Sequence, residues 1–153
     1  AVPLYEQLEL LKKNKVAVVC GILSGTLASL TGIFVLCMLF GFNHQQYVTM
    51  LPKSITTAIG IGISEELGGI GTITVAVIII TGILGNVIAD TVFHIFKIKN
   101  PLAKGLALGT ASHAIGTARA IEMGPVEGAM SSLAVAVAGL LTVVFVSGFA
   151  QLI

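Results

Sequence analysis

The chain has no tryptophan, only two tyrosines, and charged side chains at just 10% of its 153 residues. A formal net charge of +1 leaves no clustered basic face of the kind that binds nucleic acid, so we expect no nucleic-acid partner. The two cysteines, Cys20 and Cys37, lie within one apolar run, where a thiol is usually a small apolar filler. They therefore give no indication of a redox compartment.

Sequence motifs of the common enzyme sites are also absent. There is no Gly-x-Ser-x-Gly elbow and no phosphate-binding loop. The three histidines, His44, His94 and His113, are too scattered to suggest a metal cluster. We therefore expect no catalysis, no bound metal and no cofactor.

Apolar residues, by contrast, make up 56% of the chain, and the mean hydropathy is +1.03. One soluble core of this size cannot bury so much apolar surface, so lipid has to cover the rest. The uncharged run from Val16 to Phe42 exceeds the about 20 residues that a helix needs to cross about 30 Å of hydrocarbon. We predict an all-α integral membrane protein with three spanning helices, at residues 16–42, 71–96 and 126–152.

The start of the chain differs from a natural N-terminus. It has neither an initiator methionine nor the basic-then-apolar layout of a signal peptide. We therefore expect residues 1–153 to be one transmembrane domain that is a fragment of a larger one, with residues 1–15 as an amphipathic segment at the membrane interface. In the first span, Gly21 and Gly25 form a small-residue face with Ser24 and Ala28, on which another helix could pack closely.

An internal repeat appears when the sequence is compared with itself at an offset of 56. Residues 54–60 (Ser-Ile-Thr-Thr-Ala-Ile-Gly) then align with residues 110–116 (Thr-Ala-Ser-His-Ala-Ile-Gly). The same offset pairs the Glu-x-Gly of residues 66–68 with that of residues 122–124, and a long apolar stretch follows each copy. The repeated unit is therefore a polar segment followed by one span.

Both polar segments are rich in glycine, which disfavours an unbroken helix. We predict two broken segments, at residues 48–70 and 101–124, interrupted near Gly60 and Gly116. Basic residues accumulate in short cytoplasmic loops, and the chain has two basic clusters. These are Lys12, Lys13 and Lys15, and Lys97, Lys99 and Lys104.

The two clusters favour re-entrant hairpins over full crossings. If each broken segment turns back, both clusters are cytoplasmic and only Lys53 remains outside. The hairpins then enter from opposite faces, as an inverted repeat whose tips meet near the midplane. Secondary transporters often have this architecture, and broken backbone survives at that depth only when it is buried or lines a watery cavity.

Ionisable residues of the second segment are candidates for a ligand site. Arg119 and Glu122 are three residues apart and can pair on one helix face. Arg119 would either bind a substrate carboxylate while Glu122 holds or releases it, or form a permanent structural pair with Glu122. His113, among neighbouring hydroxyls, is either a substrate or proton ligand or a structural residue at the turn.

Acidic residues of the first segment and the second span have similar alternatives. Glu66, the repeat partner of Glu122, either binds a proton or cation or lies near the interface and caps its helix with Ser64. Asp90 and His94 are four residues apart and can pair as interfacial anchors.

The run Leu106–Ala118, continued by Glu122–Glu127, closely resembles the LrgB/CidB family of bacterial membrane proteins, as do Leu51–Ser54 and Ser64–Gly69. The resemblance implies either of two functions. Family members are named for holin-like or antiholin-like effects on murein hydrolase and cell lysis, whereas a plastid relative resembles a glycolate and glycerate translocator and bacterial relatives are connected with pyruvate. We therefore expect a transporter of small monocarboxylates in the bacterial cytoplasmic membrane; the alternative is a holin-like or antiholin-like pore or regulator.

The expected site lies between the hairpin tips, with a proton or Na+ as the coupling ion. The expected coupling residues are Glu66, Glu122 and His113. We also expect a homo-oligomer, such as a dimer, and a smaller LrgA/CidA-like holin partner. The expected substrate-binding residues are the hydroxyl, glycine and cationic positions Thr56, Thr57, Gly60, Ser64, Thr110, Ser112, His113, Gly116, Thr117 and Arg119.

Overall fold

Helices make up nearly all of residues 7–153, the part of the chain that a computed structural model describes, and no strand occurs among these residues. The first residues of the predicted interfacial segment, 1–6, lie outside the described part. In chain order the helices are α2 (Leu8–Lys13), α3 (Lys15–Phe40), α4 (His44–Met50), α5 (Thr57–Glu66), α6 (Gly71–Ile95), α7 (Pro101–Met123) and α8 (Pro125–Ala150).

Three helices, α3, α6 and α8, are long and apolar enough to cross a membrane, which confirms the three predicted spans. Buried residues account for only 22% to 33% of the most apolar window of each helix. The outward-facing side chains are large and apolar, such as Leu39, Val87 and Val144, which are 75%, 70% and 70% exposed. This outer surface fits a hydrocarbon surrounding rather than water.

The first broken segment is a hairpin of α4 and α5. Its first arm begins at Asn43, where the side chains of Asn43 and Gln46 each accept a hydrogen bond from the other's backbone N–H, at 2.9 and 3.0 Å. The turn occupies residues 51–56 and contains Pro52, which lacks the N–H that would continue a helix. The predicted break near Gly60 is wrong, because Gly60 lies inside α5.

The second broken segment is α7, which folds back on itself at His113. The backbone of His113 has φ 43° and ψ −135°, which are not helical angles. Gly109 before the break and Thr117 after it both contact Ser131 of α8, so the two arms lie side by side. The predicted break near Gly116 is wrong by three residues, since Gly116 is a buried helical residue that packs against Ser112.

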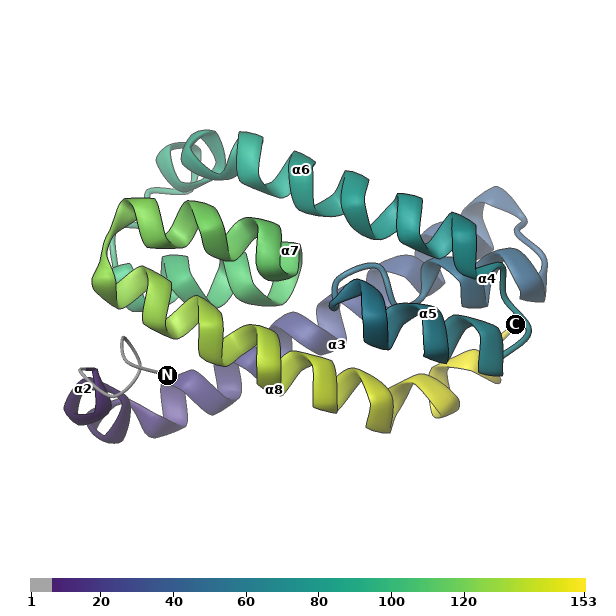
Figure 1. The fold of residues 1–153 in the computed structure, drawn as a ribbon, viewed down its shortest axis with the longest axis horizontal. Helices are drawn as coiled ribbons and strands as arrows, with labels where there is room; N and C mark the ends of the chain where they lie inside the picture. Colours follow the sequence, from purple (N-terminus) through teal and green to yellow (C-terminus); the bar gives the residue numbers. More distant parts are fainter. Residues whose placement is uncertain (1–6) are drawn as a thin grey trace.

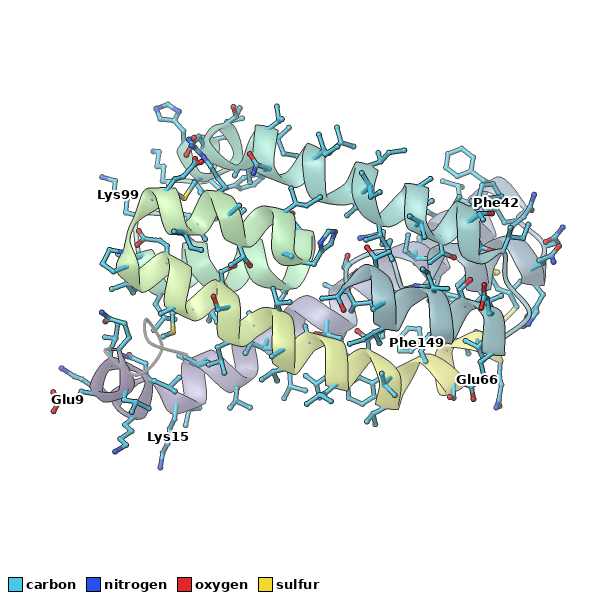
Figure 2. The ribbon with its side chains drawn as sticks, viewed as in Figure 1. Glu9, Lys15, Phe42, Glu66, Lys99 and Phe149 are labelled. Carbon is cyan, nitrogen blue, oxygen red and sulfur yellow. The ribbon has the colours of Figure 1, made fainter. Side chains whose placement is uncertain are left out.

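The two hairpins enter the molecule from opposite ends (Figure 1). The α4–α5 hairpin lies at the right end of Figure 1, and both arms of α7 lie at the left end. Figure 2 shows Lys15 and Lys99 at one end and Glu66 at the other. The basic clusters therefore share an end, as the re-entrant topology requires. The inverted-repeat relation of the two units stays a prediction.

Close packing around α7 depends on glycines in its neighbours and in α7 itself. A Cβ atom on Gly21 would lie 3.1 Å from Leu106, and one on Gly25 would lie 2.7 Å from the Thr110 hydroxyl. The predicted small-residue face of α3 therefore contacts the first arm of α7. On the other side, a Cβ on Gly109 would lie 2.5 Å from the carbonyl oxygen of Ser131.

We expect Gly109→Val to destabilise the protein by about 1 to 3 kcal/mol, because the added atoms would meet backbone rather than a movable side chain. The measurement is the thermal unfolding midpoint in detergent. The matched control is Gly32→Val, because a Cβ at Gly32 would meet nothing within 4 Å. Equal midpoints for the two variants would contradict the close approach of α7 and α8.

Candidate functional site

The two hairpins approach each other near the middle of the molecule (Figure 1). Residues of both line a small cavity, which we call the tip cavity. Ser54 and Ile55 line it from the turn of the first hairpin, and Thr110 lines it from the second. Thr26 and Ser29 of α3 and Thr142 of α8 complete its polar lining. Its volume is about 10 Å³, enough for a water-sized group.

One hydroxyl in this cavity has no partner. Thr26 is only 3% exposed, and its Oγ1 makes no hydrogen bond with any described residue. Its neighbour Thr142 donates to the carbonyl oxygen of Ala138 at 2.8 Å, as buried threonines in helices commonly do. An unsatisfied buried hydroxyl costs about 1 to 3 kcal/mol, so Thr26 offers a hydrogen bond to whatever occupies the cavity.

Lys53 lies beside this cavity, in the turn of the first hairpin. Its Nζ donates to the hydroxyls of Ser54, at 2.7 Å, and Ser29, at 3.3 Å. The Ser29 hydroxyl donates to that of Ser54 at 2.9 Å. We call Ser29, Lys53 and Ser54 the Lys53 cluster. Within residues 7–153, no carboxylate forms a salt bridge with Lys53.

The structure corrects the position that the charge pattern gave to Lys53. The sequence assigns it to an outer loop, as the one cation opposite the basic clusters, whereas the structure places it at a hairpin tip. Its neighbour Ser54 is 7% exposed, whereas Lys53 and Ser29 are half-buried, so the cluster lies at the edge of the packed interior. One signal in the sequence could have found it, since Lys53 directly precedes the first copy of the repeat, next to Pro52.

His113 lies at the tip of the second hairpin but faces α6. It is 3% exposed, and its Nε2 donates to the carbonyl oxygen of Ile78 at 2.9 Å. A Cβ atom on Gly82 would lie 2.8 Å from the ring, so the absence of a side chain there makes room for the imidazole. These contacts fit a structural residue at the turn rather than a substrate or proton ligand. His113 does not line the tip cavity.

Other predicted residues of the second hairpin hold it against its neighbours. Ser112 packs against Gly85 of α6. Thr117 donates to the carbonyl oxygen of His113 at 2.9 Å, and its hydroxyl lies 2.8 Å from that of Ser131 in α8. Thr110 is the predicted residue of this hairpin that lines the tip cavity, while its own hydroxyl donates to Leu106.

The predicted residues of the first hairpin are similarly divided. Thr56 adopts the extended conformation that begins α5 at Thr57. Gly60 packs against Ile78 of α6. Ser64 is fully buried, and its hydroxyl accepts a hydrogen bond from Thr74 at 2.7 Å. The structure therefore places Gly60 and Ser64 in contacts with α6 rather than at the tip cavity.

The charged candidates lie at the ends of the molecule rather than at the tips. Arg119 pairs with Glu122 at 2.7 Å, as their spacing allows, and also with Asp90 of α6. Asp90 bonds to Arg119 rather than to His94. Glu66 is exposed at the opposite end, as Figure 2 shows. The structure brings none of the candidate carboxylates to the Lys53 cluster.

A family model described as the LrgB-like family matches residues 1–152. The chain belongs to this family. A relative from Bacillus subtilis (strain 168), named antiholin-like protein LrgB, is 40% identical over 153 residues, which are 100% of this chain and 66% of that protein. A relative of the same name from Bacillus cereus (strain B4264) is 42% identical over 149 residues, which are 97% of this chain and 65% of that protein.

The chain thus spans about two thirds of the length of these relatives. No solved structure matches it. Together with the three helices that can span a membrane, the family assignment makes the chain part of a multi-pass membrane protein.

The positive φ of His113 can be tested by substitution at the tip of the second hairpin. A positive φ is unfavourable for histidine and alanine but open to glycine, so His113→Gly should unfold at a higher temperature than His113→Ala, by roughly 1 kcal/mol. Both variants lose the hydrogen bond to Ile78, which leaves the backbone as the difference. At the helical neighbour the order should reverse, with Ala114→Gly less stable than the parent. A more stable His113→Ala would contradict the sharp turn.

Proposed function

We propose that the protein is a secondary carrier of small monocarboxylate anions in the bacterial cytoplasmic membrane, and that the anion binds at the Lys53 cluster. The observation that carries this proposal is a lysine at a hairpin tip that pairs with no carboxylate of residues 7–153, beside a cavity lined by both hairpins. Unpaired charges inside membrane segments are costly and usually serve ion or substrate pathways. A carboxylate supplies the missing negative charge.

The donors at the tips suit a carboxylate. A lysine ammonium has three donor hydrogens, and Ser29 and Ser54 accept two of those of Lys53, which leaves one for a ligand. The unpartnered hydroxyl of Thr26 lines the adjoining cavity with Ser29 and Ser54. An anion at this position would receive a charge-assisted hydrogen bond, which is about twice as strong as a neutral one.

The tip cavity limits how far a ligand can reach past Lys53. The tip cavity holds only a water-sized group, so an acid with several heavy atoms would bind on the open side of Lys53 and extend one oxygen toward Thr26. Glycolate, glycerate and pyruvate are the acids that the family resemblance implies, and each has a carboxylate that can place one oxygen there. The coupling ion, a proton or Na+, stays a prediction. Glu66 and Glu122 lie toward the ends of the molecule, so coupling through them would act at a distance from the anion.

A second candidate is an antiholin-like role in cell lysis, as a pore or as a regulator of murein hydrolase export. The printed names of the relatives favour it. Such a role would involve assembly into homo-oligomers or with a smaller LrgA/CidA-like partner. A pore needs packing faces but no lysine held at a hairpin tip, which is why the geometry favours the carrier.

Uptake into liposomes tests the carrier. We expect saturable uptake of labelled glycolate or pyruvate by the purified full-length protein, and a loss of at least ten-fold in Lys53→Gln, which keeps hydrogen bonding but removes the charge. The control is Lys53→Arg, which keeps a positive charge at the same position and should retain saturable uptake. Unsaturable leakage of unrelated solutes through the parent protein would favour the pore, and undiminished uptake by Lys53→Gln would contradict the anion site.

Thr26→Val separates binding from stability. The valine keeps the shape and removes a hydroxyl that has no protein partner, so the unfolding midpoint without ligand should stay the same or rise. Uptake should show a several-fold higher KM. Thr142→Val is the matched control. The Thr142 hydroxyl already donates a hydrogen bond to Ala138, so its removal should lower the unfolding midpoint. An unchanged KM in Thr26→Val would remove Thr26 from the site.

A further inference from the structure

The Lys53 cluster has an open groove on one side and a buried apolar cluster on the other. On one side an open groove of about 830 Å³ runs between α3 and the first arm of α7. Ala17 and Asn100 line it near the start of these helices, and Lys53, Ser54 and Thr110 line it near the hairpin tips. Figure 2 shows Lys15 and Lys99, the sequence neighbours of this mouth, at the same end of the molecule.

Small side chains keep the groove open. Ser24 and Ala28 line its α3 wall, and Ala103, Ala107 and Ala111 line its α7 wall. Ser24, Ala28 and Ala111 are all exposed. At the floor of the groove the two walls already touch, at Gly21 against Leu106 and at Gly25 against Thr110. Larger residues at the exposed positions would fill the space above these contacts. The groove thus leads from the basic end of the molecule to Lys53. Leu102 and Leu106 are the large apolar side chains among its lining residues.

On the other side, an apolar cluster separates the hairpin turn from the opposite end. Leu30, Leu51 and Tyr47 are 1%, 1% and 0% exposed, and Ile33 and Ile55 belong to the same cluster. The Tyr47 hydroxyl donates to the carbonyl oxygen of Phe149 at 2.9 Å, which links α4 to the end of α8. We call these residues the apolar plug.

We propose that water and anions reach Lys53 along this groove, from the end that holds Lys15 and Lys99, while the apolar plug closes the opposite end. The lysines at the mouth attract anions, since basic residues of one sign raise the local concentration of the opposite charge. The groove is one-sided because the plug buries large apolar side chains, whereas the groove walls carry mostly small side chains, with the hydroxyls of Ser24, Ser29 and Thr110 among them. The anion as occupant rests on the proposed function, whereas the water path does not.

Accessibility of single cysteines tests the path. Cys20 and Cys37 are first replaced by alanine, and Ser24→Cys and Ala107→Cys are introduced into the groove of the full-length protein. A negatively charged, membrane-impermeant thiosulfonate reagent is then applied to vesicles of each orientation. We expect both groove cysteines to react from one side only, at least ten-fold faster than from the other.

Two matched controls define the background. Val87→Cys lies on α6 at a similar distance from the same end but is 70% exposed on the outer surface, and it should react slowly. Ile33→Cys lies in the apolar plug and should react slowly from both sides. Groove cysteines that react no faster than Val87→Cys would mean that lipid or protein fills the groove, and equal reaction from both sides would mean a pore; either result overturns the proposal.

Protection by ligand separates this proposal from the proposed function. We expect glycolate or pyruvate to slow the modification of Ala107→Cys, and Lys53→Gln to abolish that protection. One-sided modification without any protection would support the water path and contradict the monocarboxylate site. Protection that persists in Lys53→Gln would place the anion elsewhere in the groove.

Discussion

Lipid cannot hydrogen-bond to backbone, and the rest of this fold depends on that constraint. A broken helix survives at membrane depth only if protein surrounds the break and supplies partners for its polar groups. The break at His113 meets this condition through α6, because the side chain of Asn86 donates to the carbonyl oxygen of Ile115 at 3.1 Å and the imidazole bonds to Ile78. Gly82 and Gly109 let α6 and α8 approach closely enough to enclose it.

The same constraint explains what could be predicted from sequence. The spans follow from apolar runs whose length is set by the bilayer, so α3, α6 and α8 agree with the predicted ranges to within about two residues at each end. The offset of 56 correctly identified two broken segments. Composition places the breaks near Gly60 and Gly116, which is wrong because both glycines lie inside helices and make close contacts there. Gly60 packs against the side chain of Ile78 in α6, and Gly116 packs against Ser112 and Leu108 of the first arm of α7.

The site was harder to predict than the fold. Charge counting along the chain finds residues such as Arg119, whose partners Glu122 and Asp90 lie at an end of the bundle. It cannot give the surroundings of Lys53, which depend on Ser29 of a different helix and on a hairpin turning inward. The repeat identified the correct segments, but only the tertiary arrangement determines that Thr110 lines the cavity while Ser64 packs against Thr74.

In the proposed carrier, ligand occupancy and hairpin position are physically coupled. A cation at membrane depth costs at least about 2.5 kcal/mol, and hydrogen bonds to two serine hydroxyls offset that cost without neutralising the charge. An anion at Lys53 therefore stabilises most the conformation in which the first hairpin lies beside Thr110 and Thr26. A ligand shifts a conformational equilibrium only by its difference in affinity for the two states. A charge at the hairpin tip is an effective place for that difference. A pore would gain nothing from such coupling, whereas a carrier requires it.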